Sequence, residues 1–126
     1  MLDIQKQITY WRKSAEEDWS VGQTLASSGK IRHGLFFIHL ALEKILKANV
    51  CHATKDLAPK IHSLVRLAEI TRMALSEDQM DFLAEFGRFD IAGRYPDEGN
   101  GCLTQADAEA RFAKAQEVFQ WLSKQL

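Results

Sequence analysis

The sequence predicts an all-α fold, an antiparallel up-and-down bundle of about four to five helices, formed by one domain over residues 1–126. Three observations favour this class. Apolar residues recur at three- and four-residue steps along most of the chain, and no stretch alternates as a strand does. No internal repeat or linker divides the sequence. A chain of 126 residues is also long enough to bury one core without disulfides or a metal.

Two long helices are expected in the first half of the chain. The first covers residues 4–26, where the apolar positions follow a helical period, and the serines and glycine of residues 27–29 end it. The second covers residues 30–52 and is apolar almost all round, which is typical of the central helix of a bundle or of a subunit interface. Three residues give it more apolar surface than one small bundle should need, which predicts a homodimer. They are Phe36, Phe37 and Leu40.

Shorter helices are expected in the second half. Pro59 suits the first turn of a helix that continues towards Met73. Ser76, with Gln79 three residues later, forms a capping box that begins the next helix. Thr104 can cap a last helix, whose apolar residues keep alternating four- and three-residue steps.

Residues 92–101, AGRYPDEGNG, show neither helical nor strand periodicity and are expected to form a loop. Gly93 permits an unusual backbone angle or a close approach, and Pro96 fixes the next turn. The loop therefore holds Arg94 and Tyr95 in place. It is either a positioned ligand-binding loop or a loop whose arginine and tyrosine pack back onto the bundle.

Charge and composition limit the classes of partner. The 16 basic and 17 acidic residues give a formal net charge of -1, so any binding to nucleic acid or anionic lipid must be local. No segment approaches the length of a membrane span. Cys51 and Cys102 are isolated thiols, and the chain begins without the apolar run of a signal peptide. These features predict a cytoplasmic protein that does not bind membranes.

No metal site, cofactor or nucleophile motif is expected. His39 and Glu43 lie one turn apart, but no HExxH pattern or second pair of ligands accompanies them. Glu43 and Lys47 are also one turn apart, and ordinary helix-surface pairs explain both spacings adequately. The serines and cysteines lack the context of a nucleophile elbow, and no glycine-rich phosphate loop occurs.

Charged residues in and near the apolar helices are the candidate site. Asp18 falls on the apolar side of the first helix, where a carboxylate is costly to bury without a partner. It is expected either to reach solvent at the edge of that face or to pair with Lys44 or Lys47 beside a polar pocket. Cationic groups beside an aromatic ring suit a phosphate and a stacked base, although each is more often a solvated charge. The candidate ligand-binding residues are Asp18, Lys44, Lys47, His62, Arg94 and Tyr95.

Several motifs together resemble the HEPN family, the helical domains named for higher eukaryotes and prokaryotes nucleotide-binding. The most specific are HLALEKILKA at residues 39–48 and Arg-Tyr-Pro at residues 94–96, and the resemblance covers almost the whole chain. It implies a four- or five-helix bundle that is usually a homodimer. In prokaryotes, such a domain is often encoded beside a minimal nucleotidyltransferase, as a toxin–antitoxin-like pair.

The resemblance also raises the question of ribonuclease activity. Many members of the family are metal-independent ribonucleases whose site is an arginine followed, roughly four to six residues later, by a histidine that transfers protons. No histidine follows His62 in this sequence, so that motif is absent. We therefore expect a nucleotide- or RNA-associated partner of a nucleotidyltransferase without the usual ribonuclease activity. Two alternatives stay open: a ribonuclease that uses Arg94 with His62 or a carboxylate, and a purely structural dimerisation or adaptor bundle.

Overall fold

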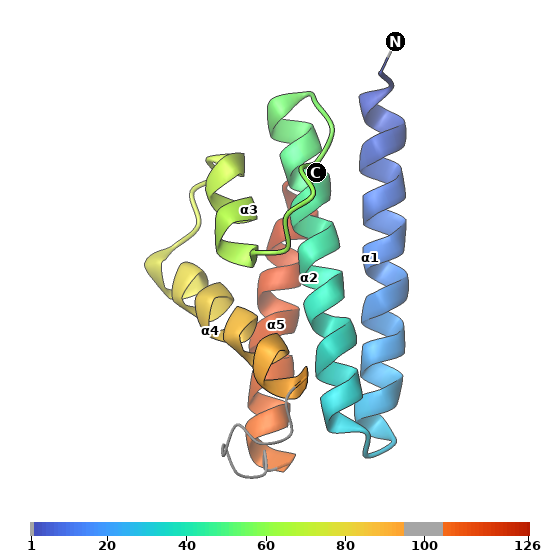
Figure 1. Cartoon of the computed structure of the whole chain (residues 1–126), viewed down its shortest axis with the longest axis vertical. Coiled ribbons are helices and arrows are strands. Elements are labelled where there is room, and N and C mark those ends of the chain that lie inside the picture. The colour runs from blue at the N-terminus through green and yellow to red at the C-terminus, as the bar shows by residue number, and fades with distance from the viewer. Residues whose placement is uncertain (1, 95–104) are drawn as a thin grey trace.

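The computed structural model describes residues 2–94 and 105–126, and the side chains of residues 2–87 and 105–126. These residues form five α-helices and no strand (Figure 1), which confirms the all-α prediction. The helices are α1 (Ile4–Ser27), α2 (Ile31–Thr54), α3 (Leu64–Thr71), α4 (Glu77–Arg94) and α5 (Gln105–Lys124).

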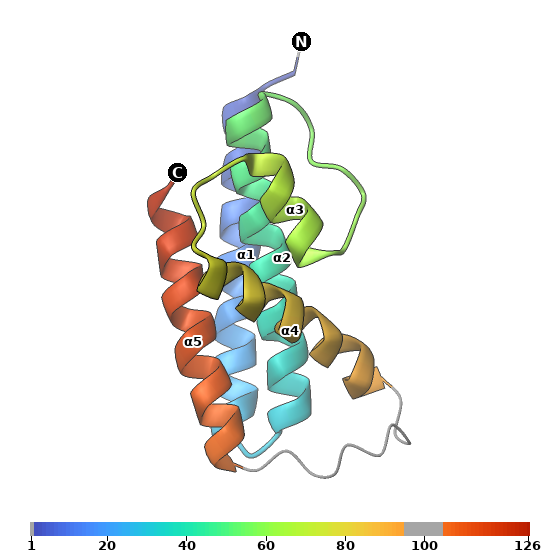
Figure 2. The ribbon, with the colours of Figure 1, turned by 90° about the vertical axis from the view of Figure 1, so that its left-hand side faces the viewer.

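The three long helices α1, α2 and α5 lie alongside one another, and α4 crosses them obliquely (Figures 1 and 2). α1 and α2 are antiparallel. Residues 55–63 return beside α2, so that the short helix α3 runs in the same direction as α2 (Figure 1). α2 contacts each of the other four helices. This central position explains why its sequence is apolar almost all round.

The backbones of α1 and α2 touch at two glycines. A Cβ atom added to Gly22 would lie 2.8 Å from the carbonyl oxygen of Gly34, and one added to Gly34 would lie 2.7 Å from the carbonyl oxygen of Gly22. A glycine inside a helix costs about 1 kcal/mol relative to alanine. The close packing of the two helices offsets this cost. It requires glycine at both positions, because a Cβ atom at either would collide with the backbone of the other helix.

The core is centred on α2 and receives side chains from every other helix. Asn49 is a buried polar residue within it, and its Nδ2 donates to the carbonyl oxygens of Ile45, at 2.9 Å, and Leu122, at 3.1 Å. One side chain thereby ties α2 to α5. Large core residues buried to less than 2% exposure include Ile38, Leu42, Ile45, Leu46, Leu67, Leu83, Phe86 and Leu122.

α3 begins later than the sequence indicates. The Ser63 side chain caps it by accepting from the backbone nitrogen of Arg66 at 3.2 Å, and Leu64 is its first residue. Pro59 therefore lies in the non-helical segment 55–63 and not in a first helical turn. A serine that can bond to a free backbone N–H defines a helix start more strongly than a proline that merely tolerates one.

α4 begins as expected and ends later than expected. Ser76 and Gln79 form the capping box, with a backbone-to-side-chain distance of 2.8 Å in one direction and 3.0 Å in the other. The helix continues to Arg94, so residues 92–94 are helical although the sequence predicts a loop there. Alanine and arginine favour a helix, and one glycine does not outweigh them. Thr104 and the rest of the predicted loop lie outside the described residues.

No helix in the described part of the chain is both long enough and apolar enough to cross a membrane.

Candidate functional site

Asp18 of α1 faces Lys44 of α2. The lysine Nζ lies 2.7 Å from Asp18 Oδ2, and the two side chains are 25% and 15% exposed for Lys44 and Asp18. The same Nζ donates to the Ser14 hydroxyl at 2.8 Å. The contact of Lys44 Nζ with Asp18 is an ion pair whose angles are not those of a hydrogen bond. Its contact with the Ser14 hydroxyl is a hydrogen bond. From the sequence, Asp18 is expected either to reach solvent or to pair with a lysine of the second helix, and in the structure it pairs with Lys44.

A second charged cluster lies one turn along α2. Lys47 Nζ is 3.2 Å from Glu43 Oε2, and His62 Nδ1 is 3.1 Å from the same oxygen. Only 8% of the Glu43 and Lys47 side chains is exposed, against 83% of the His62 side chain. The Lys47 ammonium also lies 5.1 Å from the centre of the Trp11 ring, which is within the range of a cation–π interaction.

This geometry orients the imidazole of His62. An ionised carboxylate only accepts hydrogen bonds, so His62 donates to Glu43 through Nδ1–H. When the ring is neutral, its Nε2 is then an acceptor, and the exposure of the side chain makes it accessible from solvent. The arrangement can therefore accept a hydrogen bond or a proton from a ligand while Glu43 fixes the tautomer.

The structure places four of the six predicted residues in these two clusters, and the side chains of the other two lie outside the described residues. Arg94 is the last residue of α4, but its side chain and the whole of Tyr95 lie outside the described parts. The sequence alone indicates helix-surface pairs of Glu43 with His39 and with Lys47. The pair with Lys47 forms, but both of its side chains are buried, so the surface interpretation is wrong. His39 is buried and stacks on Phe86 of α4, with ring centres 6.2 Å apart, while Glu43 contacts the imidazole of His62.

The sequence held one signal for the role of Glu43. An acid in the middle of a helix that is apolar almost all round must be buried, and a buried carboxylate needs a partner. The identity of that partner was not accessible, because His62 reaches Glu43 only through the return of the non-helical segment 55–63.

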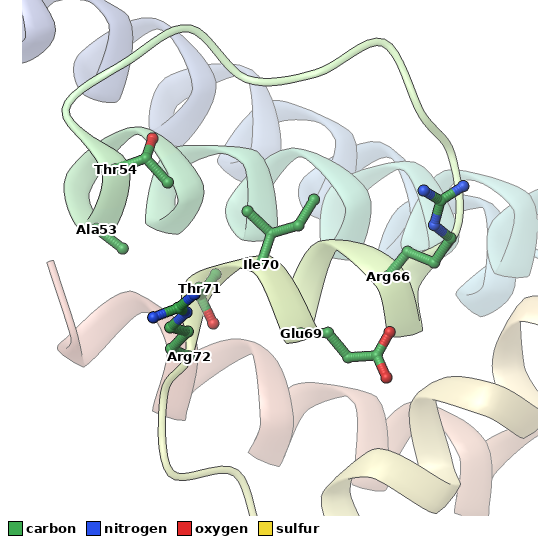
Figure 3. A pocket seen from close by; sticks show the side chains of 7 residues that line it. All are labelled: Ala53, Thr54, Arg66, Glu69, Ile70, Thr71 and Arg72. Atoms are coloured by element: carbon green, nitrogen blue, oxygen red, sulfur yellow. The ribbon is translucent and has the colours of Figure 1, made fainter.

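A cavity of about 650 Å³ lies elsewhere, between the C-terminal turn of α2 and α3 (Figure 3). None of the described residues that line it was among the predicted site residues. It is lined by Ala53, Thr54, Arg66, Glu69, Ile70, Thr71 and Arg72.

Cys51 is buried at the junction of α2 with residues 55–63. Burial raises the pKa of its thiol, and the negative charge of Asp56 raises it further, against a hydrogen bond to the backbone of Ala58 that lowers it. The thiol is therefore held in its unreactive protonated form. Within the described residues, no group of three or more His, Cys, Asp or Glu side chains is placed to hold a metal ion.

The sequence matches a known family. The family model of the HEPN domain matches residues 8–126. The chain belongs to the HEPN family. Residues 39–48 of this HEPN domain, the segment on which the resemblance most depends, supply Glu43, Lys44 and Lys47 to the two charged clusters.

Two solved structures share the HEPN fold of this chain. TT1696 from Thermus thermophilus is 20% identical over 95% of this chain and 98% of its own, with a TM-score of 0.78. ST0689, an archaeal HEPN homologue, is 20% identical over 99% of this chain and 98% of its own, with a TM-score of 0.70. At this identity the likeness supports the fold alone. No curated protein matches the sequence.

Proposed function

We propose that this HEPN domain is a nucleotide- or RNA-associated protein of the cytoplasm that partners a minimal nucleotidyltransferase in a toxin–antitoxin-like pair. It lacks ribonuclease activity of the usual type. One observation carries the last point: within a chain of this family, no histidine follows His62. The arginine at the end of α4 therefore has no histidine after it to transfer protons.

The contacts of the lysines refine which residues meet the ligand. Lys44 and Lys47 are already paired with the carboxylates of Asp18 and Glu43, so their charges are largely neutralised within the bundle. A phosphate gains more from an unpaired cation than from one that must first leave a carboxylate. We therefore assign the two lysines to positioning. Ligand contact is proposed for His62, whose ring is largely exposed although its Nδ1 meets Glu43, and for Arg94 and Tyr95 of the predicted loop.

A ribonuclease with a non-standard site is the second candidate, and the contact of His62 with Glu43 favours it. In such an enzyme, Nε2 of His62 takes the proton of an RNA 2′-hydroxyl while Arg94 contacts the phosphate. The 2′-oxygen attacks phosphorus, the bond to the 5′-oxygen breaks, and that oxygen takes a proton from water. The products are a 2′,3′-cyclic phosphate and a 5′-hydroxyl.

The test combines binding and cleavage on the purified protein. In the presence of EDTA, we expect it to bind nucleotide or RNA and to leave a panel of cellular RNAs intact. We expect Arg94→Ala to melt within about 0.5 kcal/mol of the parent and to lose at least about tenfold in affinity, or about 1.4 kcal/mol. Pairing with the nucleotidyltransferase is tested by co-expression with such a protein encoded beside this gene, where a single complex on size exclusion is expected.

Several results would contradict the proposal. If the parent binds no nucleotide or RNA and Arg94→Ala unfolds, the arginine is structural. If RNA is cleaved, and both His62→Gln and Glu43→Gln abolish cleavage, the ribonuclease is correct. The matched control is His33→Gln, an exposed histidine in the first turn of α2, which should behave like the parent in every assay. Absence of a complex with the nucleotidyltransferase removes the partner from the proposal.

A further inference from the structure

The cavity between α2 and α3 has cationic groups at its two ends and an apolar side chain between them. In Figure 3, Arg66 lies beside the start of α3, Arg72 lies beside its end, and Ile70 projects into the space between α3 and α2. Its volume of about 650 Å³ is within the range of small-ligand sites. His62, the one residue proposed above to contact a ligand whose side chain the structure describes, is not among the residues that line it.

Both arginines are available to an anion. Arg66 and Arg72 are exposed, and neither guanidinium forms an ion pair with another residue in the described parts of the chain. Arg66 is the third residue of α3 and Arg72 is its C-cap, so the helical residues 66–71 lie between them and span about 8 Å along the axis at the rise of an α-helix. A planar guanidinium matches a phosphate with two parallel hydrogen bonds, whereas one phosphate is too small to span this separation. The pair therefore fits two anionic groups better than one.

The part of the cavity between the arginines offers hydrogen-bond acceptors. The hydroxyl of Thr54 donates to the carbonyl oxygen of Val50 at 2.8 Å, which leaves its own lone pairs to accept. The last carbonyl groups of a helix have no partner within it, and α2 ends beside the cavity. Glu69 is also in the lining, although its carboxylate lies on the side of α3 away from Ile70 (Figure 3). A ligand here needs anionic ends and hydrogen-bond donors in its middle.

We propose that this cavity binds one nucleoside with a phosphate on each side, as found in single-stranded RNA, with Arg66 and Arg72 each holding a phosphate. Ile70 contacts the nucleoside, and the acceptors near Thr54 receive the 2′-hydroxyl or a base amino group. The 2′-hydroxyl is the donor that distinguishes RNA from DNA at such a position. This inference rests on the proposed association with nucleotides or RNA, and adds two phosphate contacts to it, one from α3 and one from its C-cap.

The experiment compares ligands with one and with two phosphates. Adenosine 3′,5′-bisphosphate should bind the parent protein at least about tenfold more tightly than adenosine 5′-monophosphate, because each charge-assisted contact contributes more than about 1.4 kcal/mol. Arg66→Gln and Arg72→Gln should each remove that preference. For a short labelled oligoribonucleotide, each variant should reduce the slope of log K against log salt by about 0.7, the value for one phosphate of a single strand.

Matched variants separate the site from general charge effects. Arg12→Gln removes an exposed arginine of α1 and should leave the preference and the salt slope unchanged. Arg66→Lys keeps the charge but loses the planar pair of donors, so it should retain the slope and part of the affinity. Thermal unfolding of every variant shows whether any loss of binding comes from loss of the fold.

The outcomes distinguish this inference from the proposed function. If the parent binds RNA, and loss of binding follows Arg94→Ala but neither arginine of α3, the site is overturned and the proposed function stands. If the parent binds neither RNA nor any nucleotide, both fail. Binding of the bisphosphate without the oligoribonucleotide supports the site and identifies a free nucleotide as its occupant. A stronger response to the equivalent deoxyribonucleotide overturns the assignment to RNA.

Discussion

Glu43 and Lys47 carry two opposite charges that are almost removed from solvent, with 8% of each side chain exposed. Desolvation of each charge costs several kcal/mol, and their attraction, together with the contacts to His62 and Trp11, repays that cost only while both partners are present. The pair therefore matters more for what happens when one member is lost than for its net contribution to stability.

Single substitutions in this pair should have a large effect on stability, and the double substitution a smaller one. Lys47→Met should lower the free energy of unfolding by about 3 kcal/mol, because it leaves the Glu43 carboxylate buried without its cation. Glu43→Leu combined with Lys47→Met should recover most of that loss. The control is Glu85→Gln, which breaks an ion pair whose glutamate is 63% exposed and should change stability by less than about 1 kcal/mol. Urea denaturation measures all four proteins, and an unchanged stability of Lys47→Met would show that the buried carboxylate does not need its cation.

The candidate site was only partly accessible from sequence at this scale. The cost of burying a carboxylate led from the sequence to the pairing of Asp18 with a lysine of the second helix, because both residues belong to helices whose faces can be worked out from periodicity. The contact of His62 with Glu43 could not be derived in this way. It depends on the path of a segment without periodicity, and a non-helical chain carries no repeat from which its direction can be inferred.

At the scale of elements, the backbones of α1 and α2 approach each other closely at Gly22 and Gly34. Helical periodicity predicted both helices to within about two residues at each end, as boundaries usually allow. It did not predict the glycine contact, because the same glycines are also weak positions in a helix. The predicted end of α4 is too early for a related reason: Gly93 suggests a loop, although the helix continues through it.

The close approach at Gly34 predicts that substitution by alanine lowers stability there, whereas the same substitution at Gly87 raises it. Gly34→Ala brings a Cβ to 2.7 Å from a backbone oxygen of α1 and to 3.0 Å from the backbone nitrogen of Ala26, so the helices must separate. We expect it to lower the free energy of unfolding by about 1 to 3 kcal/mol despite the gain in helix propensity. Gly87→Ala in α4 is the matched control, since a Cβ there meets no atom within 4 Å. It should raise stability by up to about 1 kcal/mol. Equal stability of the two variants in urea denaturation would show that the helices are not held at this contact.

For the molecule as a whole, α2 serves the core and also leaves apolar surface outside it. Phe36 is 37% exposed, and its ring lies 5.7 Å from that of Phe37 in an edge-to-face arrangement. Leu40 lies one turn after Phe36 and is partly exposed. With a net charge of only -1, long-range repulsion between copies is weak, so apolar contact can decide association.

We expect the protein to form a homodimer in which this surface of α2 is buried. Light scattering at about tens of micromolar, where a modest interface with micromolar affinity is saturated, should give twice the chain mass of 14.3 kDa. Phe36→Glu places a charge in the interface and should shift the mass to that of the monomer, because burial of an unpaired charge opposes association. Its unfolding midpoint then becomes independent of protein concentration, whereas that of the parent rises with concentration.

Val21→Glu, at an exposed apolar position of α1, is the control and should remain dimeric. A parent protein that is monomeric at these concentrations, or a Phe36→Glu variant that is still dimeric, would show that this surface of α2 does not form the interface.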